Sequence, residues 1–181
     1  MKITVIDCGF GNLYSIASAI KYIGFEVNIT NQPNEIETSD RIILPGVGAF
    51  GNGMKRLENS NLIEPIKASI IDRGIPFLGI CLGMQLGALE SEETKGAKGL
   101  GIIQAYIKKI KTEEKKLPHM GFNSVSRRGK EDGHKQDYYF VHSYCMELRQ
   151  QVDSVWDVEY ENKIIAAICH KNINAVQYHP E

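Results

Sequence analysis

A cysteine in a glycine-rich segment is the residue whose surroundings most plainly indicate chemistry. Cys81 is the centre of the Gly-x-Cys-x-Gly segment 79–83, directly after the apolar run 76–80 and before a helical pattern. This is the pattern of a nucleophile elbow with cysteine in place of serine, where small neighbours make room for a strained backbone. The N-terminus of the following helix favours a thiolate, and its free backbone N–H groups, especially that of Leu82, can stabilise an oxyanion. The competing interpretation is a buried structural cysteine.

A histidine and a carboxylate follow the apolar run 173–178, at His179 and Glu181. In an extended chain, side chains two residues apart leave the same face. A histidine that takes a proton from cysteine needs an acceptor on its other ring nitrogen, which Glu181 can supply. Alone, such a pair is also compatible with a solvated surface pair. Together with the elbow in one α/β chain, it predicts a catalytic triad of Cys81, His179 and Glu181.

A second glycine-containing turn follows the apolar run 41–44, in the segment Pro-Gly-Val-Gly at residues 45–48. Such a turn can present a backbone N–H to an oxyanion, because glycine adopts conformations that other residues resist. It lacks the spacing of a dinucleotide fingerprint or a P-loop, so no nucleotide site and no cofactor are predicted. No metal site is predicted either, because the adjacent Cys169 and His170 would point to opposite sides of a strand and could not both join His179.

Size and composition favour one globular domain of 181 residues, 43% of them hydrophobic. With 21 basic and 22 acidic residues, the net charge of −1 predicts no attraction to nucleic acid or to an anionic membrane. The first acid comes at Asp7, too early for a signal peptide, and no apolar run is long enough to span a membrane, so we expect a cytoplasmic protein. Cys8, Cys145 and Cys169 have no metal-ligand spacing and are interpreted as small core residues.

The order of apolar segments predicts an α/β fold. Short strands are expected at residues 3–6, 26–29, 41–44 and 76–80, and they alternate with helices over about 13–23, 54–70 and 82–89. This alternation predicts a mainly parallel sheet with helices on both faces. Further strands, expected to be antiparallel, follow at residues 102–110, 138–145, 155–160, 164–170 and 173–178. With no linker between the halves, one mixed sheet is the simplest expectation.

With these residues identified, the chain resembles the class I glutamine amidotransferases, and within them the glutaminase subunits of imidazole glycerol phosphate synthase, an enzyme of histidine biosynthesis. The similar segments, in order, are residues 7–12, 45–50, 79–85, 91–93, 118–123, 139–144 and 177–181. The resemblance implies a single flavodoxin-like amidotransferase domain over residues 1–181. It also implies that a Lys-Ser pair and a final helix, which follow Glu181 in the family, are absent.

The resemblance also implies roles. Cys81 attacks the side-chain amide of L-glutamine and forms a thioester, with an oxyanion hole at Leu82 and, after a peptide rearrangement, Val47. The remaining substrate-binding residues are implied to be Gly48, Gln85, Glu93, Ser143 and Tyr144. The ammonia passes through a channel to a (β/α)₈ cyclase partner in a heterodimer. The implied interface contains Asn12, Met120, Phe122 and Tyr138.

Three positions depart from the family, which usually has Tyr at Cys8, Trp at Phe122 and Phe at Tyr178. Because Phe122 lies in the implied interface, its change is also compatible with an alternative function within the family. In this alternative the chain supplies ammonia to a nucleotide-sugar amidotransferase in surface-polysaccharide synthesis. Outside the family, an independent cysteine hydrolase or a non-catalytic binding module of the same fold are the alternatives. The hydrolase would work at full rate alone, and the module would tolerate loss of Cys81.

Overall fold

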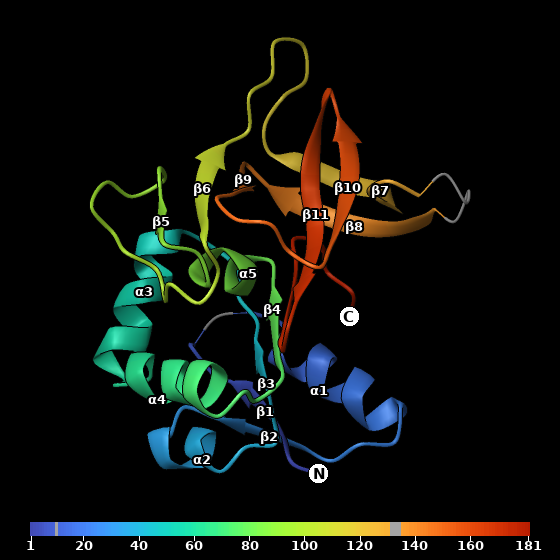
Figure 1. Ribbon diagram of the computed structural model, residues 1–181. Coiled ribbons are helices and arrows are strands. Elements are labelled where there is room, and N and C mark those ends of the chain that lie inside the picture. The colour runs from blue at the N-terminus through green and yellow to red at the C-terminus, as the bar shows by residue number, and fades with distance from the viewer. Residues whose placement is uncertain (10, 131–134) are drawn as a thin grey trace.

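The strands of the N-terminal half form the parallel part of a large sheet. The computed structural model describes residues 1–9, 11–130 and 135–181; Phe10, part of the motif at residues 7–12, therefore lies outside the described residues. These strands pair in parallel in the order β2-β1-β3-β4 (Figure 1). Their bounds, each within one residue of the expectation, are β1 Ile3–Ile6, β2 Val27–Thr30, β3 Arg41–Leu44 and β4 Phe77–Ile80.

Helices cover both faces of these strands, as predicted. Figure 1 shows α1 on one side and α2, α3 and α4 on the other. Their bounds are α1 Leu13–Tyr22, α2 Pro33–Glu37, α3 Phe50–Asn59, α4 Ile63–Lys67, the π-helical turn η1 Ala68–Asp72 and α5 Leu82–Leu86. In α1, Ile16 and Ile20 are buried against β1 and β4, and each such side chain contributes about 1.5–3 kcal/mol. Ile23, expected on the same face, is 65% exposed because the helix has already ended.

The C-terminal half extends this sheet with antiparallel strands, which confirms the predicted α/β fold. β12 joins β4 in parallel, and β11, β10, β7 and β8 follow in that order. Their bounds are β7 His119–Arg127, β8 Gln136–His142, β10 Ser154–Tyr160, β11 Asn162–His170 and β12 Ile173–Val176. β7 was not expected, because most of its side chains are exposed or half-buried and it has no apolar run.

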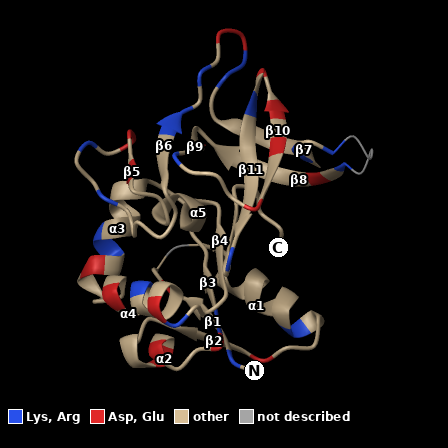
Figure 2. Ribbon diagram, in the orientation of Figure 1, with Lys and Arg blue, Asp and Glu red and all other residues tan. Residues whose placement is uncertain are grey.

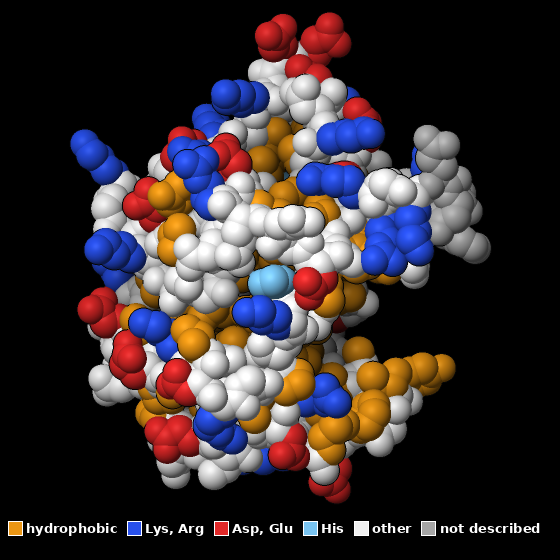
Figure 3. Space-filling view, in the orientation of Figure 1, with side chains coloured by type: hydrophobic (Ala, Val, Ile, Leu, Met, Phe, Trp, Pro, Cys, Tyr) orange, Lys and Arg blue, Asp and Glu red, His pale blue; other side chains and the backbone are white. Residues whose placement is uncertain are grey.

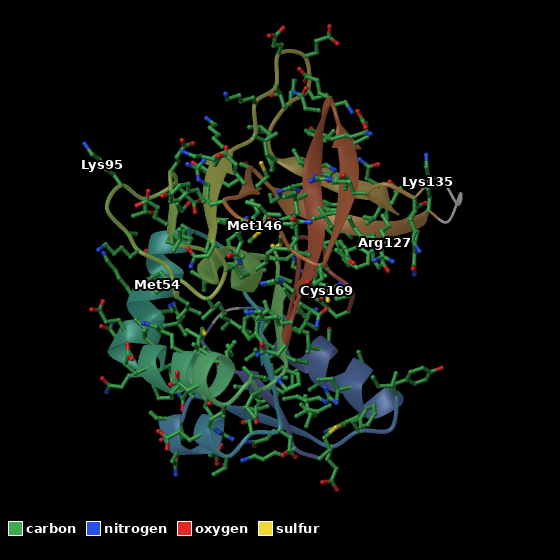
Figure 4. All side chains as sticks on the ribbon, in the orientation of Figure 1. Met54, Lys95, Arg127, Lys135, Met146 and Cys169 are labelled. Carbon is green, nitrogen blue, oxygen red and sulfur yellow. The ribbon has the colours of Figure 1, made fainter. Side chains whose placement is uncertain are left out.

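A second, three-stranded sheet corrects the expectation of one mixed sheet. It contains β5 Glu90–Ser91, β6 Ala105–Lys109 and β9 Tyr144–Leu148 in that order. The strand expected over residues 138–145 is interrupted at Ser143, so its first part belongs to the large sheet and its continuation to the small one. Phe140 lies in the core of the antiparallel strands, whereas Met146 (Figure 4) lies in the core beneath α3 and α5.

Charges are mixed over the surface. Figure 2 shows Lys and Arg as well as Asp and Glu scattered over both halves of the chain, and α3 and α4 carry both signs. This agrees with the net charge of −1. Among the described residues, no helix has both the length and the apolar character needed to cross a membrane.

Candidate active site

Cys81 lies at a sharp turn between β4 and α5. Its backbone has φ 52° and ψ −108°, a strained combination for a residue with a side chain. Both neighbouring glycines are required by close packing. A Cβ on Gly79 would lie 2.8 Å from the Gly83 carbonyl oxygen, and one on Gly83 would lie 1.7 Å from the Leu44 carbonyl oxygen. The Gly-x-Cys-x-Gly pattern therefore has a steric cause in the structure.

His179 and Glu181 form a hydrogen-bonded pair. His179 Nδ1 lies 3.0 Å from Glu181 Oε1, and the backbone N–H of His179 donates to the Tyr139 carbonyl at 3.0 Å. Among the described residues, His179 Nε2 is buried without a hydrogen-bond partner, so this nitrogen is available to a substrate. Cys81 first, and then the Glu181 carboxylate, raise the pKa of His179 to about 10, although burial opposes this. The surroundings of His179 therefore favour an imidazolium.

The raised pKa of His179 has a consequence for stability. Because its folded-state value of about 10 exceeds the ordinary 6.5, the stabilisation is fully present below pH 6.5 and is lost as the pH rises to 10. We therefore expect the free energy of unfolding of the native chain, relative to that of His179→Gln, to decrease across this window. Urea unfolding at a series of pH values measures the difference. A difference that stays constant or grows with pH would contradict the charge pairing.

A pocket of about 260 Å³ opens beside Cys81. It is lined by every residue expected in the oxyanion hole or at the substrate: Val47, Gly48, Leu82, Gln85, Glu93, Ser143 and Tyr144. It is also lined by Pro118, Val141 and His142, which lie in two of the segments that are similar to the family. A larger apolar hollow of about 470 Å³ lies beside α1, and of the expected site residues it contains Glu181 alone. In Figure 3 hydrophobic side chains gather over α1 next to an indentation of the surface.

One of the two expected oxyanion donors is already hydrogen-bonded. The Leu82 N–H donates to the Gly46 carbonyl at 3.2 Å. Gly46 precedes Val47, which is 43% exposed, and Gly48 has φ 105°, a conformation that favours glycine. Rotation of the peptide between Gly46 and Val47 would release the Leu82 N–H and turn the Val47 N–H in the opposite direction.

Gln177 contacts the cysteine and was missed as a site residue. Its Nε2 lies 3.6 Å from Cys81 Sγ, and its Oε1 accepts a hydrogen bond from Gln85 Nε2 at 2.9 Å. The same Gln85 nitrogen lies 3.3 Å from the Tyr144 carbonyl oxygen. Gln177 is fully buried. The one signal in the sequence was an amide side chain within an apolar run two residues before His179.

Glu93 is half-buried at the wall of the pocket. Its Oε2 accepts a hydrogen bond of 2.6 Å from the backbone N–H of Phe50, the first residue of α3. A carboxylate is stabilised at a helix N-terminus by the free N–H groups there. The contact ties the segment after β5 to the turn that contains Val47 and Gly48.

The residues expected at a partner interface differ in exposure. Phe122 and Met120 of β7 are 77% and 60% exposed, and Asn12 is exposed before α1. Tyr138 is half-buried, because its ring stacks on Tyr178 with centroids 3.9 Å apart.

The other thiols differ from Cys81 in their surroundings. Burial raises the pKa of Cys8 to about 12 and that of Cys145 to about 11, so both remain protonated near neutral pH. Cys8 is buried as expected, whereas Cys145 and Cys169 are only half-buried. In the described part of the chain, no three His, Cys, Asp or Glu residues are grouped so that they could hold a metal ion.

The fold and the site define a class of enzyme: the chain belongs to the class I glutamine amidotransferases, whose family pattern matches residues 4–181. Among curated relatives, it is 42% identical to "Imidazole glycerol phosphate synthase subunit HisH 2" of Methanococcus maripaludis, over 99% of this chain and 91% of the relative. It is 43% identical to "Imidazole glycerol phosphate synthase subunit HisH" of Methanothermobacter thermautotrophicus, over 99% of this chain and 90% of the relative.

Solved structures show the same fold. One described as a glutamine amidotransferase superposes with a TM-score of 0.77 at 15% identity, over 98% of this chain and 89% of the other. A glutamine amidotransferase from Thermotoga maritima superposes with a TM-score of 0.62 at 17% identity, over 99% of this chain and 75% of the other. At these identities the likeness concerns the fold alone.

Proposed function

We propose that this chain is the glutaminase subunit of imidazole glycerol phosphate synthase, and that it hydrolyses glutamine to glutamate and ammonia in the cytoplasm. The observation that carries the proposal is the pocket at the strand-to-helix turn of Cys81, together with the hydrogen-bonded His179–Glu181 pair, because Cys81 acts on the pKa of His179. The names of relatives that are 42% and 43% identical over 99% of this chain support the particular pathway, histidine biosynthesis.

The chemistry is nucleophilic catalysis by cysteine. Cys81 Sγ attacks the side-chain carbonyl carbon of glutamine, and His179 Nε2 takes the thiol proton and passes it to the leaving ammonia. Water then attacks the γ-glutamyl thioester, with His179 as general base, and releases glutamate. The Glu181 carboxylate accepts a hydrogen bond from His179 Nδ1 at 3.0 Å, which keeps Nε2 directed toward the reaction.

The oxyanion of each tetrahedral intermediate needs two donors, for which we propose the backbone N–H groups of Leu82 and Val47. The Leu82 N–H is occupied by the Gly46 carbonyl at 3.2 Å, so rotation of the Gly46–Val47 peptide is the step that completes the hole. Gly48, at φ 105°, supplies the flexible backbone for this rotation. The chain by itself is therefore in a state of low activity.

The other residues of the pocket hold the amino-acid end of glutamine in this proposal. Glu93 supplies a carboxylate for the α-amino group, while Gln85 and the backbone of Ser143 and Tyr144 supply amide and carbonyl groups at the opposite wall. Gly48 allows the close approach of the substrate, because a side chain there would face the pocket.

The ammonia needs an acceptor site, which we propose is a (β/α)₈ cyclase subunit in a heterodimer with this chain. The exposed Met120 and Phe122 of β7, together with Asn12 and Tyr138, form the proposed interface. Large apolar side chains at such exposure are typical of contact surfaces.

The test is glutamate release by the chain alone and with the cyclase subunit and its acceptor ligand. Because one oxyanion-hole donor is worth about 10²–10³ in rate, we expect stimulation of this order on assembly. Full activity of the chain alone would favour an independent hydrolase. Stimulation by a nucleotide-sugar amidotransferase partner, but not by the cyclase, would assign the chain to polysaccharide synthesis.

A further inference from the structure

Two buried histidines connect the glutamine pocket to strand β7, and the mechanism above uses neither. His119 Nδ1 lies 3.0 Å from His142 Nε2, and His142 Nδ1 lies 2.8 Å from the Tyr144 carbonyl oxygen. His119 is 2% and His142 6% exposed. His142 and Tyr144 both line the pocket.

The Tyr144 carbonyl determines the tautomer of His142. A carbonyl oxygen only accepts hydrogen bonds, so the proton of His142 is on Nδ1. Burial lowers the pKa of both histidines to about 4, and they are neutral near pH 7. His142 Nε2 is therefore an acceptor, and the hydrogen between the two rings belongs to His119 Nδ1.

The hydrogen bond between His119 and Asn123 has a fixed direction for the same reason. Neutral His119 with its proton on Nδ1 has an accepting Nε2, which lies 3.4 Å from Asn123 Nδ2. The orientation of the Asn123 amide is set by backbone groups: Oδ1 accepts from the Ser124 N–H at 2.9 Å, and Nδ2 donates to the Glu159 carbonyl at 2.9 Å. The hydrogen bonds from Asn123 to His119, from His119 to His142 and from His142 to Tyr144 thus form a relay. In each of them the donor is the group nearer to Asn123 and the acceptor is the group nearer to Tyr144.

A second chain of hydrogen bonds leads from the same carbonyl to the cysteine. The Tyr144 oxygen also accepts from Gln85 Nε2 at 3.3 Å, Gln85 donates to Gln177 at 2.9 Å, and Gln177 Nε2 lies 3.6 Å from Cys81 Sγ. The Tyr144 carbonyl is thus the point where the histidine relay meets the contacts of the nucleophile.

We propose that His119 and His142 are positioning residues, which hold the Tyr144 carbonyl at the pocket wall through a hydrogen-bond relay of fixed direction that begins at Asn123 in β7. The proposal rests on the proposed function, because the held segment is the one assigned to bind glutamine. A neutral imidazole donates from one ring nitrogen and accepts at the other, and in each histidine the two nitrogens contact different neighbours. Moving the proton of either ring from Nδ1 to Nε2 would therefore place that N–H against the N–H of the neighbouring donor.

The direction of the relay is tested without any activity. Long-range ¹H–¹⁵N correlation spectra of the ¹⁵N-histidine-labelled chain distinguish the two neutral tautomers. We expect His119 and His142 to be neutral near pH 7 with the proton on Nδ1. A proton on Nε2 of His142, or a charged ring, would overturn the proposal even if the chain proves to be a glutaminase.

Two variants of His119 separate positioning from packing, because its ring also stacks on Phe140 and Tyr160 with centroids 4.7 and 4.1 Å away. His119→Phe keeps an aromatic ring and removes the donor. His119→Asn removes the ring and keeps an amide nitrogen close to the place of Nδ1. Melting temperatures of both variants monitor the fold.

We expect His119→Phe to raise KM for glutamine about tenfold with a smaller change in kcat, and His119→Asn to stay within about threefold of the native complex. The ¹⁵N signal of His142 Nε2 should shift to that of a nitrogen without a hydrogen bond in the first variant and stay near its native position in the second, while the proton remains on Nδ1 in both. The reverse order of KM values would assign His119 to packing and overturn the proposal. A native complex without glutaminase activity would instead refute the proposed function, while the tautomer experiment still decides the direction of the relay.

Discussion

Cys81→Ala should abolish glutamate release in the assembled enzyme, with a decrease in kcat of more than about 10⁴-fold. Among the described residues that line the pocket, Cys81 alone has a thiol that can form the thioester, and water at this position is a far weaker nucleophile. The methyl group of alanine fits the volume occupied by the cysteine, so the fold should not change. Glutamate formation in the presence of the cyclase and its acceptor ligand measures the effect.

Ammonium ions supply the internal control for this experiment. The Cys81→Ala complex should still make product when ammonia is added directly, because the partner's site is unaffected. Cys169→Ala is the matched variant, since this half-buried cysteine of β11 (Figure 4) does not line the pocket, and it should keep the native rate. Glutamate release by Cys81→Ala within tenfold of the native rate would rule out the thioester mechanism.

His179→Ala should lower kcat by about 10³-fold or more, through both halves of the reaction. Without the imidazole, nothing takes the proton of the thiol, protonates the leaving ammonia or activates the hydrolytic water. The raised pKa of about 10 indicates that His179 holds this proton well. Single-turnover measurements should therefore show slow formation of the thioester as well as slow hydrolysis.

Two variants complete this comparison. Glu181→Gln keeps a hydrogen-bond acceptor for His179 Nδ1 but removes the negative charge, so its loss of kcat should lie between those of the native chain and of His179→Ala. His170→Ala removes a histidine of β11 that pairs with Asp153 at 3.4 Å, and should leave kcat unchanged. Equal losses for His179→Ala and His170→Ala would show that the histidine effect is structural.

Much of the fold followed from local pattern. The strands β1, β3 and β4 are short apolar runs, and α1 places Ile16 and Ile20 on one buried face. These signals are local because burial on both faces of a parallel sheet requires continuous apolar residues. The missed features are non-local. The break at Ser143 and the second sheet depend on the pairing of β9 with β6, whose residues are about 40 positions apart in the sequence.

The sequence by itself determined which residues are capable of chemistry and which family they resemble, because Cys81, His179 and Glu181 lie in short motifs whose residue types and spacing have direct chemical reasons. Only the tertiary structure decided how these groups are held. It places Gln177 against the Cys81 sulfur, the Gly46 carbonyl on the Leu82 N–H, and two histidines behind Tyr144. Except for the bond from His142 to Tyr144, these contacts join distant parts of the chain and have no sequence period, so they appear only when the strands are packed side by side.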